Sequence, residues 1–393
     1  MTLDLARIRS EFPALSAGLA HFDSPGGTQT PRPVIEATST ALSRPLANRG
    51  HGNLAQRNAE EIVLGARQAV ADLTGGQPDG VVFGRSATAL TFDFARMLAR
   101  DWQSGDEVVV SRLDHDANIR PWVTAAEGRG AVVRWVDFDP ATGELERVNA
   151  VLTERTRLVA LTAASNLIGT RPDIATAAAA VHRVGALLWV DGVHYAAHAQ
   201  VDVRTLGCDF FVCSPYKFFG PHHGALVADP ARLADLHPEK LLPSSNAVPE
   251  RFELGTLPYE VLAATTAAID YLAGLVPGTG PRRARLAASH AGAEEHETRL
   301  VRRIEEGLAE RSATLYSRAR RRTSTLLFDL PGRDAAAVAA TLAAQGVNAP
   351  AGHFYALEAS RHLGLGDRGA VRVGLAPYND DEDVDRLLTG LTG

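Results

Sequence analysis

Short apolar runs alternate with longer amphipathic stretches along the first two thirds of the chain. Runs of this length, bounded by turn residues, predict buried strands. They occupy residues 81–83, 107–111, 132–136, 158–161, 187–190 and 210–213. Helical patterns separate several of them, as at residues 56–73, 145–152 and 174–184. Repeated strand, helix, strand units predict an α/β fold with a mainly parallel sheet and helical crossovers.

The last third of the chain repeats this alternation on a smaller scale. The predicted elements are helices at 259–275, 280–312, 334–345 and 381–391 and strands that include 323–328 and 370–375. The first 20 residues resemble an amphipathic helix. A chain of 393 residues exceeds what one compact core usually holds. We therefore predict an N-terminal arm (1–20) packing on the small domain, a large domain (21–262) and a small C-terminal α/β domain (263–393).

Composition limits the classes of partner. The formal net charge of −6 gives no basic footprint for nucleic acid. Four arginines lie within residues 318–322, but such a short run is more typical of a solvated segment. No apolar run is long enough to span a bilayer. Cys208 and Cys213 flank one predicted strand and are expected to be buried thiols rather than a disulfide. We expect a cytoplasmic protein with no membrane partner.

Two predicted strands deliver an acid and an amine to one edge of the sheet. Asp191 ends the strand at 187–190, and Lys217 follows the strand at 210–213. Ligands of open α/β sheets bind at the carboxyl ends of strands. A lysine can hold an aldehyde cofactor as a Schiff base, while a carboxylate keeps a pyridine nitrogen protonated. The pair suits pyridoxal 5'-phosphate (PLP), although an isolated Asp-Gly turn or a solvated lysine is the commoner role of either residue.

Three other strand ends carry polar side chains. Ser86 and Thr88 follow the strand at 81–83 and stand beside helix-start amides, an arrangement that suits a phosphate dianion. The same hydroxyls are equally suited to plain N-caps. His115 and Asn166 follow the strands at 107–111 and 158–161, where a capping histidine and a turn asparagine are the ordinary alternatives.

These motifs together resemble one family. With VDG at 190–192, Ser214-x-x-Lys217, RFELGT at 251–256 and AVRVG at 370–374, the sequence resembles the class V aminotransferase family of fold-type I PLP enzymes, in particular its cysteine-desulfurase-like branch. The resemblance runs over nearly the whole chain. It implies a large domain with a mainly parallel, seven-stranded type of sheet and a smaller C-terminal α/β domain.

The resemblance also implies roles for individual residues. Lys217, Asp191 and His115 would be catalytic, with His115 stacked on the PLP ring. The cofactor contacts that it implies are Ala87, Thr88, His115, Asn166, Asp191, His194, Ser214, Tyr216, Lys217 and Thr256. Ala87 and Tyr216 depart from the hydroxyl and the histidine usual at their positions, which leaves their phosphate contacts open. In relatives the threonine matching Thr256 reaches the PLP of the other subunit, which implies a homodimer with composite active sites.

The same resemblance points to the substrate. Arg372 stands where relatives bind the substrate α-carboxylate, which implies a small-molecule α-amino acid, and a guanidinium is the preferred fork for that group. Asn166 would share the carboxylate, and Gly27 would line the substrate side. His51 and Tyr355 are further candidate substrate residues.

Tyr355 marks a departure from true cysteine desulfurases. It occupies the place of their nucleophilic cysteine, and no cysteine follows Cys213. Persulfide chemistry needs a thiolate, so we do not expect it. Our first hypothesis is β-elimination, cleaving the C–S bond of an S-substituted cysteine. Transamination, epimerisation and decarboxylation-linked deamination remain open.

Two other classes of function fit the sequence less well. A metal site built from histidines would lack acidic partners and fixed spacings, so no metal is expected; its members would be His194, His198, His222 and His223. A non-catalytic PLP-fold binding protein would have no physical need for all the functional residues that the chain retains. These are His115, Asn166, Asp191, Lys217 and Arg372.

Overall fold

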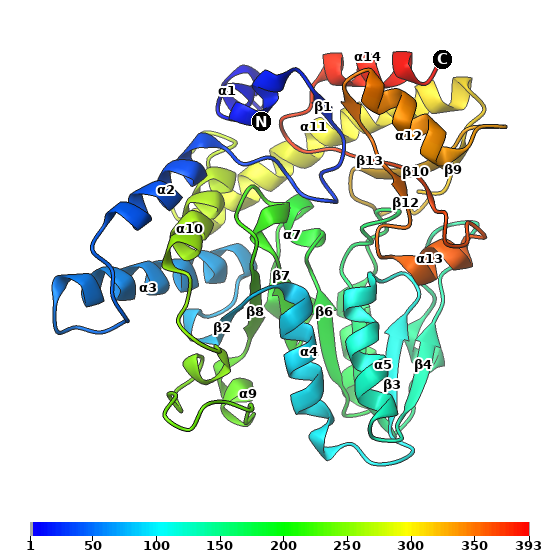
Figure 1. The fold of residues 1–393 in the computed structure, drawn as a ribbon. Coiled ribbons are helices and arrows are strands. Elements are labelled where there is room, and N and C mark those ends of the chain that lie inside the picture. Colours follow the sequence, from blue (N-terminus) through cyan, green and yellow to red (C-terminus); the bar gives the residue numbers. More distant parts are fainter. Residues whose placement is uncertain (1–2, 393) are drawn as a thin grey trace.

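A seven-stranded sheet forms the centre of the larger domain (Figure 1). The computed structural model describes residues 3–392. The sheet has the order β2-β8-β7-β6-β5-β3-β4, and only β8 runs antiparallel to its neighbours. Its strands are β2 Val81–Gly84, β3 Glu107–Ser111, β4 Val132–Val136, β5 Thr156–Thr162, β6 Leu187–Asp191, β7 Phe210–Cys213 and β8 Gly224–Ala228. The predicted α/β class and mainly parallel sheet are confirmed.

Both faces of this sheet are covered by helices. Along β3, Val109 faces one apolar core while Val108 and Val110 face the other, because successive side chains alternate across a strand. The first core is closed by α3 Leu54–Thr74, α6 Ile174–Arg183 and α10 Tyr259–Ala273. The second is closed by α4 Ala87–Leu98 and α5 Arg120–Glu127. The strand ends are therefore the polar edge that remains for a site.

The smaller domain contains an antiparallel sheet of order β12-β13-β10-β9. The strands are β9 Thr314–Leu315, β10 Thr325–Asp329, β12 Ala351–Gly352 and β13 Ala370–Gly374. A parallel pair, β1 Ala20–His21 with β11 Val347–Asn348, lies beside it. The helices are α11 Arg282–Glu310, α12 Ala335–Ala344, α13 Leu357–His362 and α14 Asp381–Gly390. The long helix α11, yellow in Figure 1, runs from beside α10 to these C-terminal elements.

The opening segment differs from the single amphipathic helix expected over residues 1–20. It holds a short helix, α1 Leu5–Ser10, and a 3-10 turn, Pro13–Ala17. Pro13 cannot continue the α-helix, and Gly18 ends the turn in a left-handed conformation. Arg7 donates to the carbonyls of Gly274 and Leu275, whereas Arg9 pairs with Asp383 on α14. The arm thus contacts both the α10–α11 connection and the smaller domain.

Two further expectations differ from the structure in where an element or a domain begins and ends. The division placed after residue 262 falls inside α10, and the whole helix packs with the large-domain core. The expected helix at 145–152 is only a 3-10 turn, Val148–Ala150, because Leu145 is extended in a β-bridge to Phe138.

The remaining elements are one longer helix, α2, and several short segments. They are the helices α2 Arg32–Ser43, α7 Tyr195–His198, α8 Val203–Leu206 and α9 Pro230–Ala234, and the 3-10 turns Pro78–Gly80, Ala99–Asp101, Asp116–Asn118, Pro215–Lys217 and Glu250–Phe252. Within residues 3–392, no helix combines the length and apolar character that crossing a bilayer requires.

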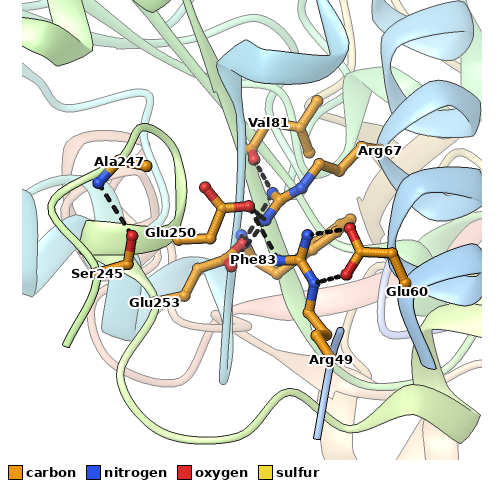
Figure 2. A network of polar contacts seen from close by, with 9 residues as sticks. All are labelled: Arg49, Glu60, Arg67, Val81, Phe83, Ser245, Ala247, Glu250 and Glu253. Carbon is orange, nitrogen blue, oxygen red and sulfur yellow. Dashed lines mark hydrogen bonds and ion pairs between the residues drawn. The ribbon is translucent and has the colours of Figure 1, made fainter. Parts of the chain in front are cut away.

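A network of ion pairs ties the segment around Glu250 and Glu253 to α3 (Figure 2). Arg67 on α3 is 1% exposed and contacts both carboxylate oxygens of Glu253 at 2.9 Å. Glu250 accepts from Arg67 at 3.3 Å and from Arg49 at 2.9 Å. Arg49 is also held by both oxygens of Glu60. The network fixes the start of the RFELGT segment against the large domain.

Candidate active site

A cavity of about 580 Å³ opens at the carboxyl ends of the central strands. The strands β2, β3, β5, β6 and β7 each lead directly into residues that line it. Of the predicted residues, the lining includes Ala87, Thr88, His115, Asn166, Asp191, His194, Ser214, Tyr216, Lys217, Tyr355 and Arg372. The fold therefore gathers most of the sequence candidates in one place.

Lys217 is a buried amine in this cavity. Its Nζ donates to the carbonyl of Pro25 and lies 4.5 Å from the centre of the Tyr216 ring. Burial is the main cause that lowers the pKa of Lys217 to about 7, and the positive charge of Arg372 adds to it. A large fraction of this amine is therefore unprotonated at neutral pH, the form in which it is a nucleophile or a base.

Asp191 lies at the end of β6 and is also buried. Its Oδ1 accepts a hydrogen bond from the Val193 N–H at 2.8 Å. Burial raises the pKa of Asp191 to about 6, while that N–H and Lys217 act in the opposite direction. The carboxylate is thus mostly ionised at pH 7, as a partner for a protonated pyridine nitrogen must be.

Sequence reasoning missed a second buried acid, Asp114, next to His115. Burial raises its pKa well above the usual value, and the charge of Asp191 adds to this. Asn118 donates to its Oδ1 at 2.6 Å. Burial and the nearby Asp191 carboxylate thus both disfavour the charged form of Asp114, while the Asn118 hydrogen bond ties its side chain to the turn after β3. Its position after an apolar strand was the available signal.

His115 is held as a neutral ring. Its Nδ1 accepts from the Ala117 N–H at 3.0 Å, which places the proton of the neutral imidazole on Nε2. Burial, with smaller contributions from Lys217 and Arg372, lowers the pKa of His115 to about 4. The ring stacks on Tyr355 with centroids 5.6 Å apart.

The start of α4, which lines the same cavity, has the form of an anion cup. Ser86 is the N-cap of α4, and its Oγ accepts from the Ala89 N–H at 3.0 Å. Ala87 and Thr88 begin the helix, so free amides of its first turn face the cavity end. Gly224 lies against this turn: a Cβ there would overlap Ser86 and lie 2.5 Å from the Ala87 nitrogen.

The predicted carboxylate site is already engaged by protein groups. Arg372 donates from Nη1 to the Asn166 carbonyl at 3.1 Å and pairs through Nη2 with Asp23. The Phe354 ring covers its guanidinium, with 3.6 Å between Cζ and the ring centroid. Asn166 Nδ2 donates to the Phe354 carbonyl at 3.0 Å. Sequence reasoning missed Asp23 and Phe354, although Phe354 lies next to Tyr355, which it did consider.

Several candidates lie elsewhere or have other partners. Thr256 and His51 are exposed and do not line the cavity. Gly27 lines a neighbouring cleft of about 850 Å³. His194 lines the cavity, but its Nε2 already contacts the hydroxyls of Thr323 and Thr325 at 2.9 and 3.0 Å.

The four histidines considered for a metal do not converge. His194 and His198 pack together, with ring centroids 4.7 Å apart. His222 instead stacks on Tyr216, and His223 binds the Thr265 hydroxyl. Among residues 3–392, no three or more His, Cys, Asp or Glu side chains are gathered as a metal site.

Neither cysteine is placed as a nucleophile. Cys213 is fully buried in β7, and Cys208 is partly exposed near the start of that strand. Burial raises the pKa of each thiol to about 12. Neither residue lines the cavity. A thiolate at neutral pH is therefore not available to the site from either residue.

Comparison with known proteins identifies the family. The aminotransferase class-V family matches residues 20–387. The chain belongs to the class V aminotransferase family. It is 34% identical to an uncharacterized protein of Mycobacterium tuberculosis (100% of this chain, 99% of the relative). It is 31% identical to an aminotransferase-like protein of Gibberella zeae (99% and 98%) and 30% identical to a cysteine desulfurase of Salmonella agona (100% and 98%).

Solved class V structures have the same fold. The cysteine desulfurase CsdA of Escherichia coli matches with a TM-score of 0.88 and 27% identity, over 100% of this chain and 98% of CsdA. A cysteine desulfurase of Thermococcus onnurineus matches with a TM-score of 0.89 and 25% identity, over 99% and 97%. The predicted family and the fold-type I architecture are confirmed.

Class V enzymes use PLP, and the cavity fits this cofactor. A buried amine with a pKa of about 7 and an ionised carboxylate lie in one cavity with a helix start shaped for a phosphate. Asn166 Oδ1 is buried there without a hydrogen-bond partner among the described residues. Lys217, Asp191, His115 and the first turn of α4 are the groups that would hold it.

Proposed function

We propose that this class V enzyme cleaves the C–S bond of an S-substituted cysteine by β-elimination. The observation that carries the proposal is a PLP-type cavity without an ionisable thiol: Lys217 has a pKa of about 7, while the pKa of Cys213 is raised to about 12. Sulfur transfer to the protein would need, besides the lysine, a thiolate within reach of the cofactor. An elimination needs only a base and an electron sink.

Each residue has a part in this reaction. Bound PLP would supply the electron sink for the electron pair left when the α-proton is removed. The Lys217 amine takes that proton, and the Asp191 carboxylate keeps the pyridine nitrogen protonated. The neutral His115 ring holds the cofactor plane, and Arg372 with Asn166 orients the α-carboxylate. The C–S bond breaks with its electron pair on sulfur, so substrate and water yield thiol, pyruvate and ammonium.

The proposal includes a homodimer. Thr256 is exposed in one chain and follows the segment fixed by Arg67 and Glu253, so it is free to meet another subunit. Leu254, beside it, is 65% exposed, as is Leu42 on α2. Burial of these side chains against a second chain would remove their apolar surface from water. Thr256 of the partner subunit would then complete the phosphate cup, and the partner's His51 would approach the substrate.

Transamination is the second candidate. The 31% identical relative from Gibberella zeae is described as aminotransferase-like. In that reaction Lys217 would return the proton to the cofactor side, and a 2-oxo acid would form without release of thiol.

Product analysis tests the proposal. The PLP-loaded protein is incubated with S-methyl-L-cysteine and, separately, with L-cysteine. We expect methanethiol, pyruvate and ammonium in equal amounts from the first substrate, and their loss in Lys217→Ala. A Cys208→Ala/Cys213→Ala variant serves as the matched control and should keep the activity. Alanine with protein-bound sulfur from L-cysteine would refute the proposal, and a 2-oxo acid that retains the thioether would establish transamination.

A further inference from the structure

Two nitrogens of the Arg372 guanidinium are engaged by other groups of the protein, while Nε is buried without a hydrogen-bond partner among the described residues. Arg372 is 1% exposed. Nη2 pairs with the Asp23 carboxylate, and Nη1 donates to the Asn166 carbonyl. A carboxylate binds arginine best through two parallel N–H groups in one plane. In this state, one of those groups already belongs to Asp23.

The face of the same guanidinium is covered by a loop in a strained conformation. Phe354 and Tyr355 both have positive φ angles, 50° and 60°, which are unfavourable for bulky residues. Asn166 holds the Phe354 carbonyl, and the Asp116 N–H donates to the Tyr355 carbonyl at 2.7 Å. The surrounding contacts therefore keep the Phe354 ring on Arg372. A carboxylate would therefore reach the Arg372 guanidinium from the side that Asp23 now occupies.

Asp23 is placed to act as an exchangeable partner. Its side chain is 29% exposed, whereas that of Arg372 is 2% exposed. It lines both the active cavity and the neighbouring cleft, and its carboxylate lies so close to Gly26 that a Cβ there would be 2.3 Å from Oδ2. Asp23 can therefore regain water when it leaves the pair, but Arg372 cannot. A buried guanidinium without a partner is costly, so a second carboxylate must take the place that Asp23 leaves.

We propose that Asp23 and the substrate α-carboxylate compete for Arg372, which makes Asp23 a specificity-determining residue. Asp23 neutralises the buried guanidinium in the empty site, and only a ligand that brings its own carboxylate replaces it. The site thereby discriminates against amines without a carboxylate. This inference rests on the proposed function in one respect, that Arg372 receives the α-carboxylate of an amino acid.

The test compares Asp23→Asn with the unchanged holoenzyme. Asparagine keeps the volume and an acceptor oxygen but removes the competing charge. Propionate, a carboxylate without an amine, is titrated by calorimetry. We expect it to bind about tenfold more tightly to Asp23→Asn, the effect of one charge-assisted hydrogen bond. The KM for S-methyl-L-cysteine should fall in parallel.

Asp116→Asn is the matched control. Asp116 lines the same cavity and pairs with Arg120, so the variant loses the same charge without touching Arg372. Propionate binding to it should not change. Unchanged or weaker propionate binding in Asp23→Asn would overturn the inference, and a fall in kcat alone would assign Asp23 to proton transfer instead.

Two further measurements keep the test decisive. If S-methyl-L-cysteine is not turned over, the propionate titration still tests the exchange, so failure of the proposed function is distinguished from failure of this inference. If Asp23→Asn does not fold, a crystal structure of the unchanged holoenzyme with propionate decides. We expect propionate on Arg372 with Asp23 displaced, and Asp23 still paired with Arg372 beside bound propionate would refute the exchange.

Discussion

Arg67 and Glu253 form a buried, bidentate ion pair that joins α3 to the RFELGT segment. Both N–O distances are 2.9 Å, and the side chains are 2% and 4% exposed. Glu253 Oε1 also accepts from the Phe83 N–H on β2 at 2.9 Å. The pair thus connects three parts of the large domain that are distant in sequence (Figure 2).

Removing one partner should be strongly destabilising. We expect Arg67→Met to lower the free energy of unfolding by about 3–5 kcal/mol, because Glu253 is left as a buried charge without its partner. Urea denaturation measures this. Glu61→Gln is the control, since Glu61 pairs with Arg44 at a side-chain exposure of 72% and should change stability by less than about 1 kcal/mol. Equal effects of the two variants would contradict the assigned role of Arg67.

Capture of the cofactor should depend on pH through Lys217. Below its pKa the amine is an ammonium ion and cannot attack an aldehyde; above it the amine is free. With a pKa of about 7, the rate at which the PLP-free protein captures PLP should rise between pH 6 and 8 and level off above. Stopped-flow absorbance of the visible chromophore measures this. A rate that continues to rise beyond pH 9 would show a lysine with an ordinary pKa.

Gly224 should be needed for the phosphate end of the site. In Gly224→Ala the new methyl group meets the Ser86–Ala87 backbone, so the first turn of α4 must move. We expect a loss of about 1–3 kcal/mol in stability and weaker PLP binding. Equilibrium dialysis with PLP and thermal unfolding measure the two effects.

Gly65→Ala provides the matched control for that substitution. Gly65 lies within α3, and nothing is within 4 Å of the position that its Cβ would take. Alanine there should stabilise the protein by about 0.5–1 kcal/mol, because alanine is the better helix former. PLP affinity should remain unchanged in this variant, which separates a local effect on the site from a general effect on folding.

The thiols should be dispensable. We expect Cys208→Ala/Cys213→Ala to keep kcat within about twofold and to lose about 1–3 kcal/mol of stability, because only buried volume is removed. Iodoacetamide should leave the native enzyme active, since burial raises both thiol pKa values to about 12. Inactivation that follows alkylation of Cys208 or Cys213 would contradict this prediction.

Most strands of the large domain and the reactive pair could be predicted from the sequence alone. Six of the seven strands of the large sheet were predicted as apolar runs, because most of them are buried on both faces; β8 Gly224–Ala228 was not predicted. Strand ends in a parallel sheet meet at one edge. Asp191 and Lys217 were therefore predictable as neighbours. The absence of a thiol after Cys213 was also readable from the chain alone.

The partners of Arg372, the residue predicted to bind the substrate carboxylate, became apparent only in the folded chain. Asp23 and Arg372 are 349 residues apart in sequence, and no periodicity relates them. No local sequence pattern predicts that the Phe354 ring covers the Arg372 guanidinium. Nor does one predict that His194 contacts Thr323 and Thr325, which lie in the other domain. Local patterns report which face of an element is buried. The partner of a buried charge depends on which elements the folded chain brings together. For this reason Arg372 was expected to be free for the substrate α-carboxylate, but it is paired with the Asp23 carboxylate.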